Sequence, residues 1–445
     1  MKRGLLLAAW AAASVLAVPA QAQVSADWVR AHETFLAGDE LRGRGSATPD
    51  EAIAAAYVAA QFRGFGLQPA PGMDGYLQKA KIVRLQLKAP ITLTANGVAV
   101  PGAVLLVGDG TGSEGIARLT PAKALSRMAP AAVMLITGEM PVMQLYRLAR
   151  SFKTPRLLLV RESAETQAML KGLHGEPRLP GGLYGDSREP SPSIVVLPAA
   201  AFDALATEKE PKVALTVPVE EKIITTTNAI GWLPGSDPKA GVLLLSAHLD
   251  HLGVQADGTI LHGANDDASG TTAVLELART LAAKGKNKRG ILFVAYGSEE
   301  IGGYGSTYFG AHPPVPLDQI VANVEVEMIG AQDPKLPAGT MMMTGFERST
   351  LGETLKRHGA LVTADPYPEQ NFFQRSDNYS LAKKGVVAHT ISGWAVVPTY
   401  HSKDDTVANI DIAFMTRAIQ SLVEPLHALA NSDAKPEWKP GGKPE

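Results

Sequence analysis

From about Ile223 onward, uninterrupted apolar runs alternate with amphipathic stretches, and this alternation limits the folds available to the chain. The runs V-L-L-L-S-A-H, G-I-L-F-V-A-Y-G-S and I-V-A-N-V-E-V-E have the length and continuity of strands buried on both faces. The stretch T-T-A-V-L-E-L-A-R-T-L-A-A-K places its apolar residues at helical spacing. A fourth strand is expected at G-V-V-A-H-T-I-S, and a last helix over about 410–430. The pattern predicts an α/β domain with a mostly parallel central sheet flanked by helices.

The mature chain is expected to divide into four parts. Residues 23–87 read as a helical N-terminal part of the same domain, with a helix that starts at S-A-T-P-D-E. Residues 88–220 hold short β-like runs between turn-rich pieces and none of the candidate catalytic motifs, which predicts an inserted β-rich domain. A continuation of the main sheet is the alternative. The catalytic domain is expected over 221–430, and the polar, proline-rich tail 431–445 is expected to be disordered.

The first residues have the pattern of a secretory signal. M-K-R is followed by an apolar run and then by P-A-Q-A, which predicts a signal peptide over 1–22 with cleavage after Ala22. A membrane anchor is the alternative, but the run is too short to span a bilayer comfortably. We therefore expect an exported protein, periplasmic or secreted, with no membrane association after signal cleavage.

Charge and cysteine content narrow the partners and the chemistry. The formal charge of the chain is −2, and removal of Lys2 and Arg3 leaves 40 basic against 44 acidic residues. The sequence has no basic patch of the kind that would predict binding to nucleic acid. The chain has no cysteine, so a metal must be bound by histidine and carboxylate side chains. Zinc accepts such ligands, and manganese or cobalt would accept them too.

Two predicted strands end in polar residues suited to metal chemistry. His248 and Asp250 close the first, and because residues two apart share a face, the Asp250 carboxylate can orient the His248 ring. Glu299 and Glu300 close the second, and their side chains point apart, so one can bind a metal while the other acts as general base. A solvated charge pair is the alternative for the two glutamates.

Three further motifs follow the same logic. Asp266 and Asp267 lie in a G-A-N-D-D-A-S-G turn before a helix, where one can bind metal while the other caps the helix. Glu325 and Glu327 share one face of an apolar strand, where a carboxylate needs either a metal or a salt-bridge partner. His401 lies in Y-H-S-K-D-D-T after the fourth strand. Since parallel strands end at one edge of the sheet, these motifs are expected to form one pocket.

The remaining histidines are assigned by their surroundings. Those near the motifs are candidates for lining the site, namely His251, His262 and His389. Those without a motif are expected to be structural or surface residues, namely His32, His174, His312, His358 and His427.

The ligands at the motifs have the number and kind that can bind two divalent metals side by side, an arrangement that activates water for hydrolysis. The residues therefore predict a hydrolase.

The motifs resemble those of the co-catalytic di-zinc exopeptidases of clan MH. That family includes bacterial leucyl aminopeptidase, aminopeptidases S and Y and glutamate carboxypeptidase. The resemblance extends to L-R-G-R-G-S-A-T-P near the start, N-A-I-G-W-L-P-G-S-D-P before the first strand, and F-F-Q-R-S-D-N-Y-S-L-A-K-K-G-V near the end. It implies the zinc exopeptidase fold, and residues 88–220 resemble the protease-associated domain that such enzymes often contain.

The resemblance implies a role for each site residue. His248 and Glu327 would bind one zinc and Glu300 and His401 the other, with Asp266 bridging the two. Glu299 would be the general base, Asp250 would orient His248, and Asp405 would support His401. The resemblance also implies a cis peptide bond after Asp266. Apart from the resemblance, Tyr400 stands beside His401 in the sequence and could donate a hydrogen bond to the oxyanion. Two positions depart from the family pattern: Glu327 stands where aspartate is more usual, which leaves Glu325 as a competing ligand, and Asn378 stands where many relatives have histidine.

The resulting expectation is a secreted metallo-aminopeptidase that acts on peptides with two zinc ions. A carboxypeptidase or dipeptidase on the same site is the first alternative and would need a cation for the substrate carboxylate, for which Arg375 is the candidate. The resemblance also leaves open a single-zinc glutaminyl cyclase and a non-catalytic receptor-like module.

Overall fold

The computed structural model describes residues 23–119, 133–150, 157–173 and 177–445. The predicted signal peptide over 1–22, its cleavage site after Ala22, and His174 lie outside the described residues. No helix within the described ranges is both long and apolar enough to cross a membrane. The helices are α1 (Ala26–Leu36), α2 (Pro49–Gly64), α4 (Val142–Arg150), α5 (Ala164–Gly172), α6 (Ala199–Thr207), α7 (Ser269–Ala283), α8 (Tyr304–Ala311), α9 (Leu351–Arg357), α10 (Asn378–Lys383) and α11 (Ile412–Asn431). Short helical turns are η2 (Asp39–Arg44), η3 (Ala264–Ala268), η4 (Leu317–Gln319), η5 (Phe346–Arg348), η6 (Pro368–Gln370), η7 (Phe372–Gln374) and η8 (Val407–Asn409).

A nine-stranded sheet organises the larger domain, and its order is β18-β17-β19-β16-β12-β15-β11-β1-β8. The strands are β1 (Leu77–Leu87), β8 (Gly181–Leu183), β11 (Val219–Leu233), β12 (Val242–His248), β15 (Gly290–Tyr296), β16 (Ile320–Val326), β17 (Met341–Met343), β18 (Val362–Ala364) and β19 (Ala388–Ser392). The four central strands β15, β12, β16 and β19 run parallel, and antiparallel pairs flank them. The predicted α/β class and the parallel centre of the sheet are confirmed.

Alternate residues of the central strands face two cores, as the twofold side-chain period of a strand requires. On β12, Leu243 and Leu245 pack with α1, α2, α7 and α11, whereas Leu244 packs on the opposite side with Phe309 of α8 and Leu381 of α10. Both faces are therefore covered, which explains why these strands read as continuous apolar runs. Thr48 caps α2 and Pro49 begins it, within the S-A-T-P-D-E segment where the helix was expected to start.

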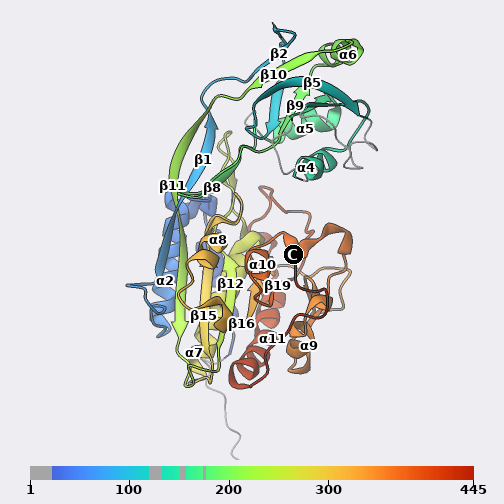
Figure 1. Cartoon of the computed structure of the whole chain (residues 1–445). Coiled ribbons are helices and arrows are strands. Elements are labelled where there is room, and N and C mark those ends of the chain that lie inside the picture. The colour runs from blue at the N-terminus through green and yellow to red at the C-terminus, as the bar shows by residue number, and fades with distance from the viewer. Residues whose placement is uncertain (1–22, 120–132, 151–156, 174–176) are drawn as a thin grey trace, which may run out of the picture.

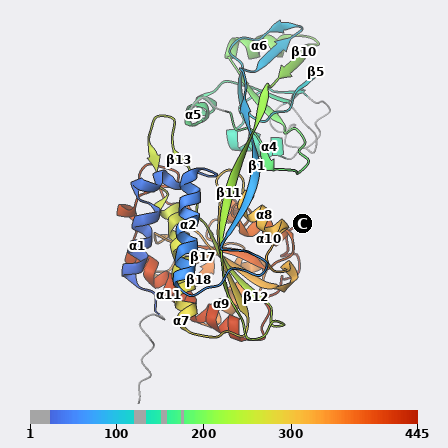
Figure 2. The same cartoon turned by 90° about the vertical axis from the view of Figure 1, so that its left-hand side faces the viewer.

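Two long strands connect the main sheet to the inserted segment. Residues Leu77–Leu87 of β1 pair along their whole length with Val219–Ala229 of β11, and this ribbon rises out of the sheet to carry the insert (Figures 1 and 2). The insert has its own eight-stranded sheet, in the order β3-β2-β10-β5-β6-β7-β9-β4, with α4, α5 and α6 beside it. Its strands are β2 (Thr92–Ala95), β3 (Val98–Ala99), β4 (Val104–Val107), β5 (Gly112–Leu119), β6 (Val133–Ile136), β7 (Leu157–Arg161), β9 (Ser193–Leu197) and β10 (Lys212–Thr216).

The C-terminal segment is ordered, so the expectation of a disordered tail over 431–445 is wrong. The Trp438 indole donates a hydrogen bond to the carbonyl of Gly385 at 3.0 Å and packs at ring-centroid distances of 6.2 Å from Phe373 and 5.2 Å from His389. The backbone also pairs with Ser349 through an isolated bridge. The contacts of one aromatic side chain therefore order this segment, although its polar, proline-rich composition predicted disorder.

Candidate metal centre

The sheet brings three of the predicted motifs to one edge. His248 is the last residue of β12, Glu299 and Glu300 follow the end of β15, and Glu327 follows the end of β16. These strands are parallel neighbours, so their carboxyl ends lie together. Asp266 comes from η3, between β12 and α7. The edge opens into a cleft of about 2490 Å³ that is lined by both the main domain and the insert.

Six side chains from separate parts of the chain form two adjoining groups around one shared carboxylate. The His248 group contains His248, Asp266 and Glu327, and the His401 group contains His251, Asp266, Glu300 and His401. In each group, one candidate ligand atom per residue lies within 4.8 Å of all the others. His401 Nε2 lies 3.1 Å from both Asp266 Oδ2 and Glu300 Oε1, and His248 Nε2 lies 3.3 Å from Asp266 Oδ1. The five predicted metal ligands thus converge.

Buried polar atoms at this centre fit two divalent cations. His248 Nε2 and Asp266 Oδ2 are buried and make no hydrogen bond with a described residue, a costly arrangement unless another partner is present. Burial raises the pKa of Glu299 well above its usual range, and the carboxylate of Glu300 adds to that effect. Burial also raises the pKa of Glu327, to which the nearby Asp266 carboxylate contributes. A hard or borderline divalent cation would neutralise crowded carboxylates of this kind and accept neutral imidazoles as ligands.

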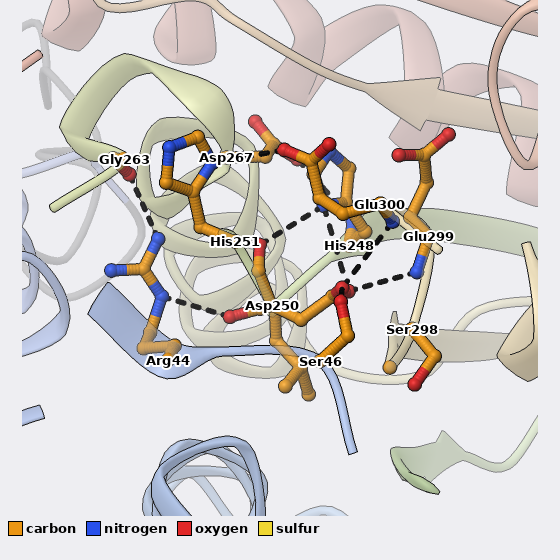
Figure 3. A network of polar contacts seen from close by, with 12 residues as sticks. Arg44, Ser46, His248, Asp250, His251, Gly263, Asp267, Ser298, Glu299 and Glu300 are labelled. Atoms are coloured by element: carbon orange, nitrogen blue, oxygen red, sulfur yellow. Dashed lines mark hydrogen bonds and ion pairs between the residues drawn. The ribbon is translucent and has the colours of Figure 1, made fainter. Parts of the chain in front are cut away.

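Asp250 contacts His248 as expected, but its closest contacts are with other groups. His248 Nδ1 lies 3.2 Å from the backbone carbonyl of Asp250 and 3.8 Å from its carboxylate. The carboxylate instead accepts hydrogen bonds from the backbone N–H groups of Glu299 and Glu300, at 3.0 and 3.4 Å, and from the hydroxyl of Ser46 (Figure 3). Its closest contacts therefore position the two glutamates.

A second buried carboxylate holds the residue before Glu299. Ser298 has a left-handed backbone with φ of 58°, and its hydroxyl donates to Glu51 of α2 at 3.0 Å. Glu51 also accepts from the backbone N–H groups of Ala47 and Thr227. The turn that carries the two glutamates is thus fixed on one side by Asp250 and on the other by Glu51.

Asp267 and Asp405 position the shared ligand Asp266. Asp405 accepts from the backbone N–H groups of Asn265 and Asp266 at 2.8 and 3.1 Å, so it supports the Asp266 loop and not the ring of His401 as expected. Asp267 accepts from the backbone of Gly270 in the first turn of α7, so it supports the start of the helix from the residue before the N-cap Ala268. The peptide bond between Asp266 and Asp267 is cis, as the resemblance implied.

Arg44 ties the N-terminal segment to the loops of the centre, and the sequence reasoning gave it no role. Its guanidinium is fully buried and donates to the carbonyls of Leu36, Leu249 and His262. It also donates to the carbonyl of Gly263 (Figure 3). Leu249 follows His248, and Gly263 precedes the Asp266 turn, so one cation joins the two loops that carry these ligands. The motif L-R-G-R-G-S could have marked Arg44 as a candidate functional residue, but it does not reveal which carbonyls Arg44 contacts.

We expect Arg44→Met to destabilise the protein by at least about 3 kcal/mol, because several buried carbonyls would lose their donor at about 1–3 kcal/mol each. Urea unfolding, followed by circular dichroism with and without added zinc, measures the effect. Arg30→Met on the exposed face of α1 is the control and should change stability by no more than about 0.5 kcal/mol. Equal midpoints for the two variants would contradict a bridging role for Arg44.

Glu327, and not Glu325, lies in a candidate metal group. Glu325 is fully buried, and its Oε2 accepts from the backbone N–H of Asn378 and the hydroxyl of Thr390. Asn378, which departs from the family pattern, donates its side-chain amide to the carbonyls of Phe373 and Ala388. Asn378 therefore has structural contacts of its own.

The other predicted site residues lie at or beyond the edge of the centre. The Tyr400 ring stacks on the ring of His401 at a centroid distance of 3.8 Å, and both line the cleft. Arg375 lines the cleft too. His262 Nε2 lies 2.7 Å from Asp39, and His389 contacts Thr344 and Ser349, so neither ring joins a metal group.

The sequence from within β11 to within α11 matches a known family. A family model described as peptidase family M28 matches residues 228–424, which include every residue of the two metal groups. This part of the chain, residues 228–424, is similar to peptidase family M28. The match confirms the expected relationship to clan MH exopeptidases.

Curated M28-like relatives align over part of the chain. The leupeptin-inactivating enzyme 1 of Streptomyces exfoliatus is 28% identical over 211 residues, which is 43% of this chain and 46% of that protein. Aminopeptidase YwaD of Bacillus subtilis is 31% identical over 130 residues, or 29% of this chain and 26% of that protein. The chain thus spans less than half the length of these relatives.

Solved M28 structures share the fold over nearly the whole chain. An aminopeptidase from Aneurinibacillus sp. strain AM-1 matches with a TM-score of 0.59 and 18% identity, covering 92% of this chain and 95% of that one. BSAP, a zinc aminopeptidase from Bacillus subtilis, matches with a TM-score of 0.55 and 17% identity, covering 92% and 96%. The coverage includes the inserted segment as well as the main sheet.

Proposed function

We propose that this protein is an exported, two-zinc aminopeptidase that removes N-terminal residues from peptides. The observation that carries the proposal is the pair of ligand groups that share Asp266. Two metals bound there would supply Lewis acidity toward the scissile carbonyl and lower the pKa of the attacking water. The N-terminal sequence pattern supports export, and the names of the aminopeptidase relatives support the activity.

Glu299 is the residue that handles the proton. It belongs to neither ligand group, yet its backbone is fixed beside Glu300 by Asp250, and it lines the cleft. A carboxylate with a raised pKa in such a position can take a proton from the attacking water and later pass it to the leaving amine. Tyr400 is proposed to donate its hydroxyl hydrogen to the carbonyl oxygen as negative charge develops there.

Three acidic side chains of the cleft lining favour aminopeptidase polarity. Glu299, Glu300 and Asp377 all line the cleft, and both carboxylate oxygens of Asp377 are buried without a hydrogen bond to a described residue. A protonated α-amino group would neutralise such carboxylates, whereas a terminal carboxylate would be repelled by them.

One observation favours carboxypeptidase polarity as the second candidate. Arg375 is exposed on the cleft wall, and its guanidinium lies 4.9 Å from the ring centroid of Phe372. No residue within the described ranges forms an ion pair with it. A cation in this position can bind the α-carboxylate of a peptide.

A substrate panel distinguishes the two polarities. Peptides with a free N-terminus and a blocked C-terminus should be cleaved, peptides with the reverse blocking should not, and a chelator should abolish cleavage, with activity restored by zinc. Release of the N-terminal residue is followed by mass spectrometry. Cleavage that requires a free C-terminus would replace the proposal with the carboxypeptidase, and chelator-resistant cleavage would exclude metal dependence.

A further inference from the structure

His251 is a member of the His401 group to which the resemblance gave no ligand role. We propose that His251 is a fourth protein ligand of the metal bound by this group, through its Nδ1 atom. The proposal rests on the proposed two-metal function and adds one imidazole to the set of metal ligands. The His401 group would then have four protein ligands and the His248 group three.

The ring of His251 is enclosed and lacks an ordinary hydrogen-bond partner. The side chain has no solvent exposure, and neither ring nitrogen makes a hydrogen bond with a described residue. A buried imidazole without partners loses its hydration without compensation. Nδ1 nevertheless lies 2.9 Å from Glu300 Oε1 and 3.9 Å from Asp266 Oδ2, two atoms already assigned to the group. The nitrogen is thus directed at the ligand cluster.

The spacing of the four atoms matches a tetrahedral zinc site. Ligand atoms about 2.0–2.1 Å from a tetrahedral zinc are about 3.3 Å from one another. The measured separations from His251 Nδ1 are 2.9 Å to Glu300 and 3.9 Å to Asp266, and those from His401 Nε2 are 3.1 Å to each of the same carboxylates. One candidate ligand atom from each of the four residues lies within 4.8 Å of all the others. These distances bracket the tetrahedral value, as expected for atoms around one common centre.

The surrounding chain fixes the ring in this position. The backbone of His251 forms a short parallel bridge with Gly45, accepting from Ser46 N at 3.2 Å and donating to the carbonyl of Arg44 at 3.1 Å. Gly263 has a positive φ of 59°, and a Cβ there would lie 2.4 Å from Cγ of the His251 ring. Figure 3 shows the ring between Arg44 and Glu300. The glycine therefore leaves the space that the ring occupies.

A fourth ligand makes the two halves of the centre unequal. Zinc sites with four protein ligands are closed, whereas sites with three keep a position for water or substrate. The His401 group would bind the first equivalent of metal more tightly. The His248 group would keep the open position at which the substrate carbonyl is polarised. The structure thus assigns metal retention mainly to the His401 group and substrate contact to the His248 group.

X-ray absorption at the zinc edge of the fully loaded wild-type protein tests the proposal by counting imidazole ligands. We expect three imidazoles for two zinc ions, from His248, His251 and His401, and two imidazoles would overturn the assignment. This measurement needs no variant and no activity. Failure of the wild-type protein to bind two zinc ions would instead contradict the proposed function on which the inference rests.

Titration of the metal-free variant His251→Asn with zinc provides the second test. Loss of a ligand should weaken one of the two sites by more than about 100-fold, whereas a residue that only hydrogen-bonds to a ligand costs about 10–100-fold. His262→Asn is the matched control, because its ring contacts Asp39 outside both groups, and its zinc affinities should equal those of the wild type. Two unchanged sites in a folded His251→Asn protein would overturn the proposal.

Discussion

Replacing Asp266 by alanine should remove zinc from both halves of the centre at once and reduce peptidase activity to the level of the chelated protein. Asp266 is the one residue common to the two ligand groups, with Oδ1 3.3 Å from His248 and Oδ2 3.1 Å from His401. Without it, each group loses a ligand, and the negative charge that separates two neighbouring cations disappears. Zinc content after dialysis, measured by mass spectrometry of the metal, checks the result.

Glu325→Gln is the matched control for this variant. Glu325 is also a fully buried carboxylate beside the centre, but its contacts are with Asn378 and Thr390, and glutamine keeps an acceptor for them. It should therefore keep two zinc ions. An Asp266→Ala protein that retained both ions would contradict a shared ligand, and loss of zinc in Glu325→Gln would indicate that the ligand assignment on this strand is wrong.

Replacing Glu299 by glutamine should lower kcat by about 10²–10⁴-fold while leaving the zinc content unchanged, because a positioned general base contributes a factor of this size. The amide keeps the shape of the side chain but cannot accept the proton of the attacking water. Steady-state kinetics on a peptide with a free N-terminus, together with metal analysis, separates the two effects.

The neighbouring residue supplies the comparison. Glu300→Gln changes a member of the His401 group, so it should lose zinc affinity together with activity, unlike Glu299→Gln. Glu369→Gln, on the wall of the same cleft, should change neither. If Glu299→Gln retained wild-type kcat, Glu299 would not be the base. If it lost zinc, it would be a ligand.

The α/β class and the parallel centre of the sheet could be predicted because they depend on local patterns. Strands such as β12 are covered on both faces, so every residue from Val242 to His248 is buried and the run reads as apolar throughout. His248, Glu299, Glu300 and Glu327 could be found for the same reason, since they end or closely follow such a run. The ordered tail could not be predicted, because the residues that contact Trp438, namely Phe373, Gly385 and His389, lie 49 or more positions away in the sequence.

The supporting residues were less accessible to sequence reasoning. Asp250 and Asp405 were expected to orient histidine rings, but their carboxylates accept mainly from the backbone of the loops that carry Glu299 and Asp266. Arg44 and Glu51 reach partners 205 and 247 residues away along the chain. Such pairings depend on the conformation of the loops. A sequence motif identifies one residue of the pair but not its partner.

The sequence by itself determined the residue types of the centre and the order in which strands deliver them, because apolar runs and their polar ends are local properties. Only the tertiary structure decided which of these residues meet. It placed Glu327 in the His248 group while directing Glu325 to Asn378 and Thr390, and it turned the buried ring of His251 toward Glu300. The physical reason is that a metal group is defined by distances of a few ångströms between side chains, and those distances are set by packing across the whole sheet edge.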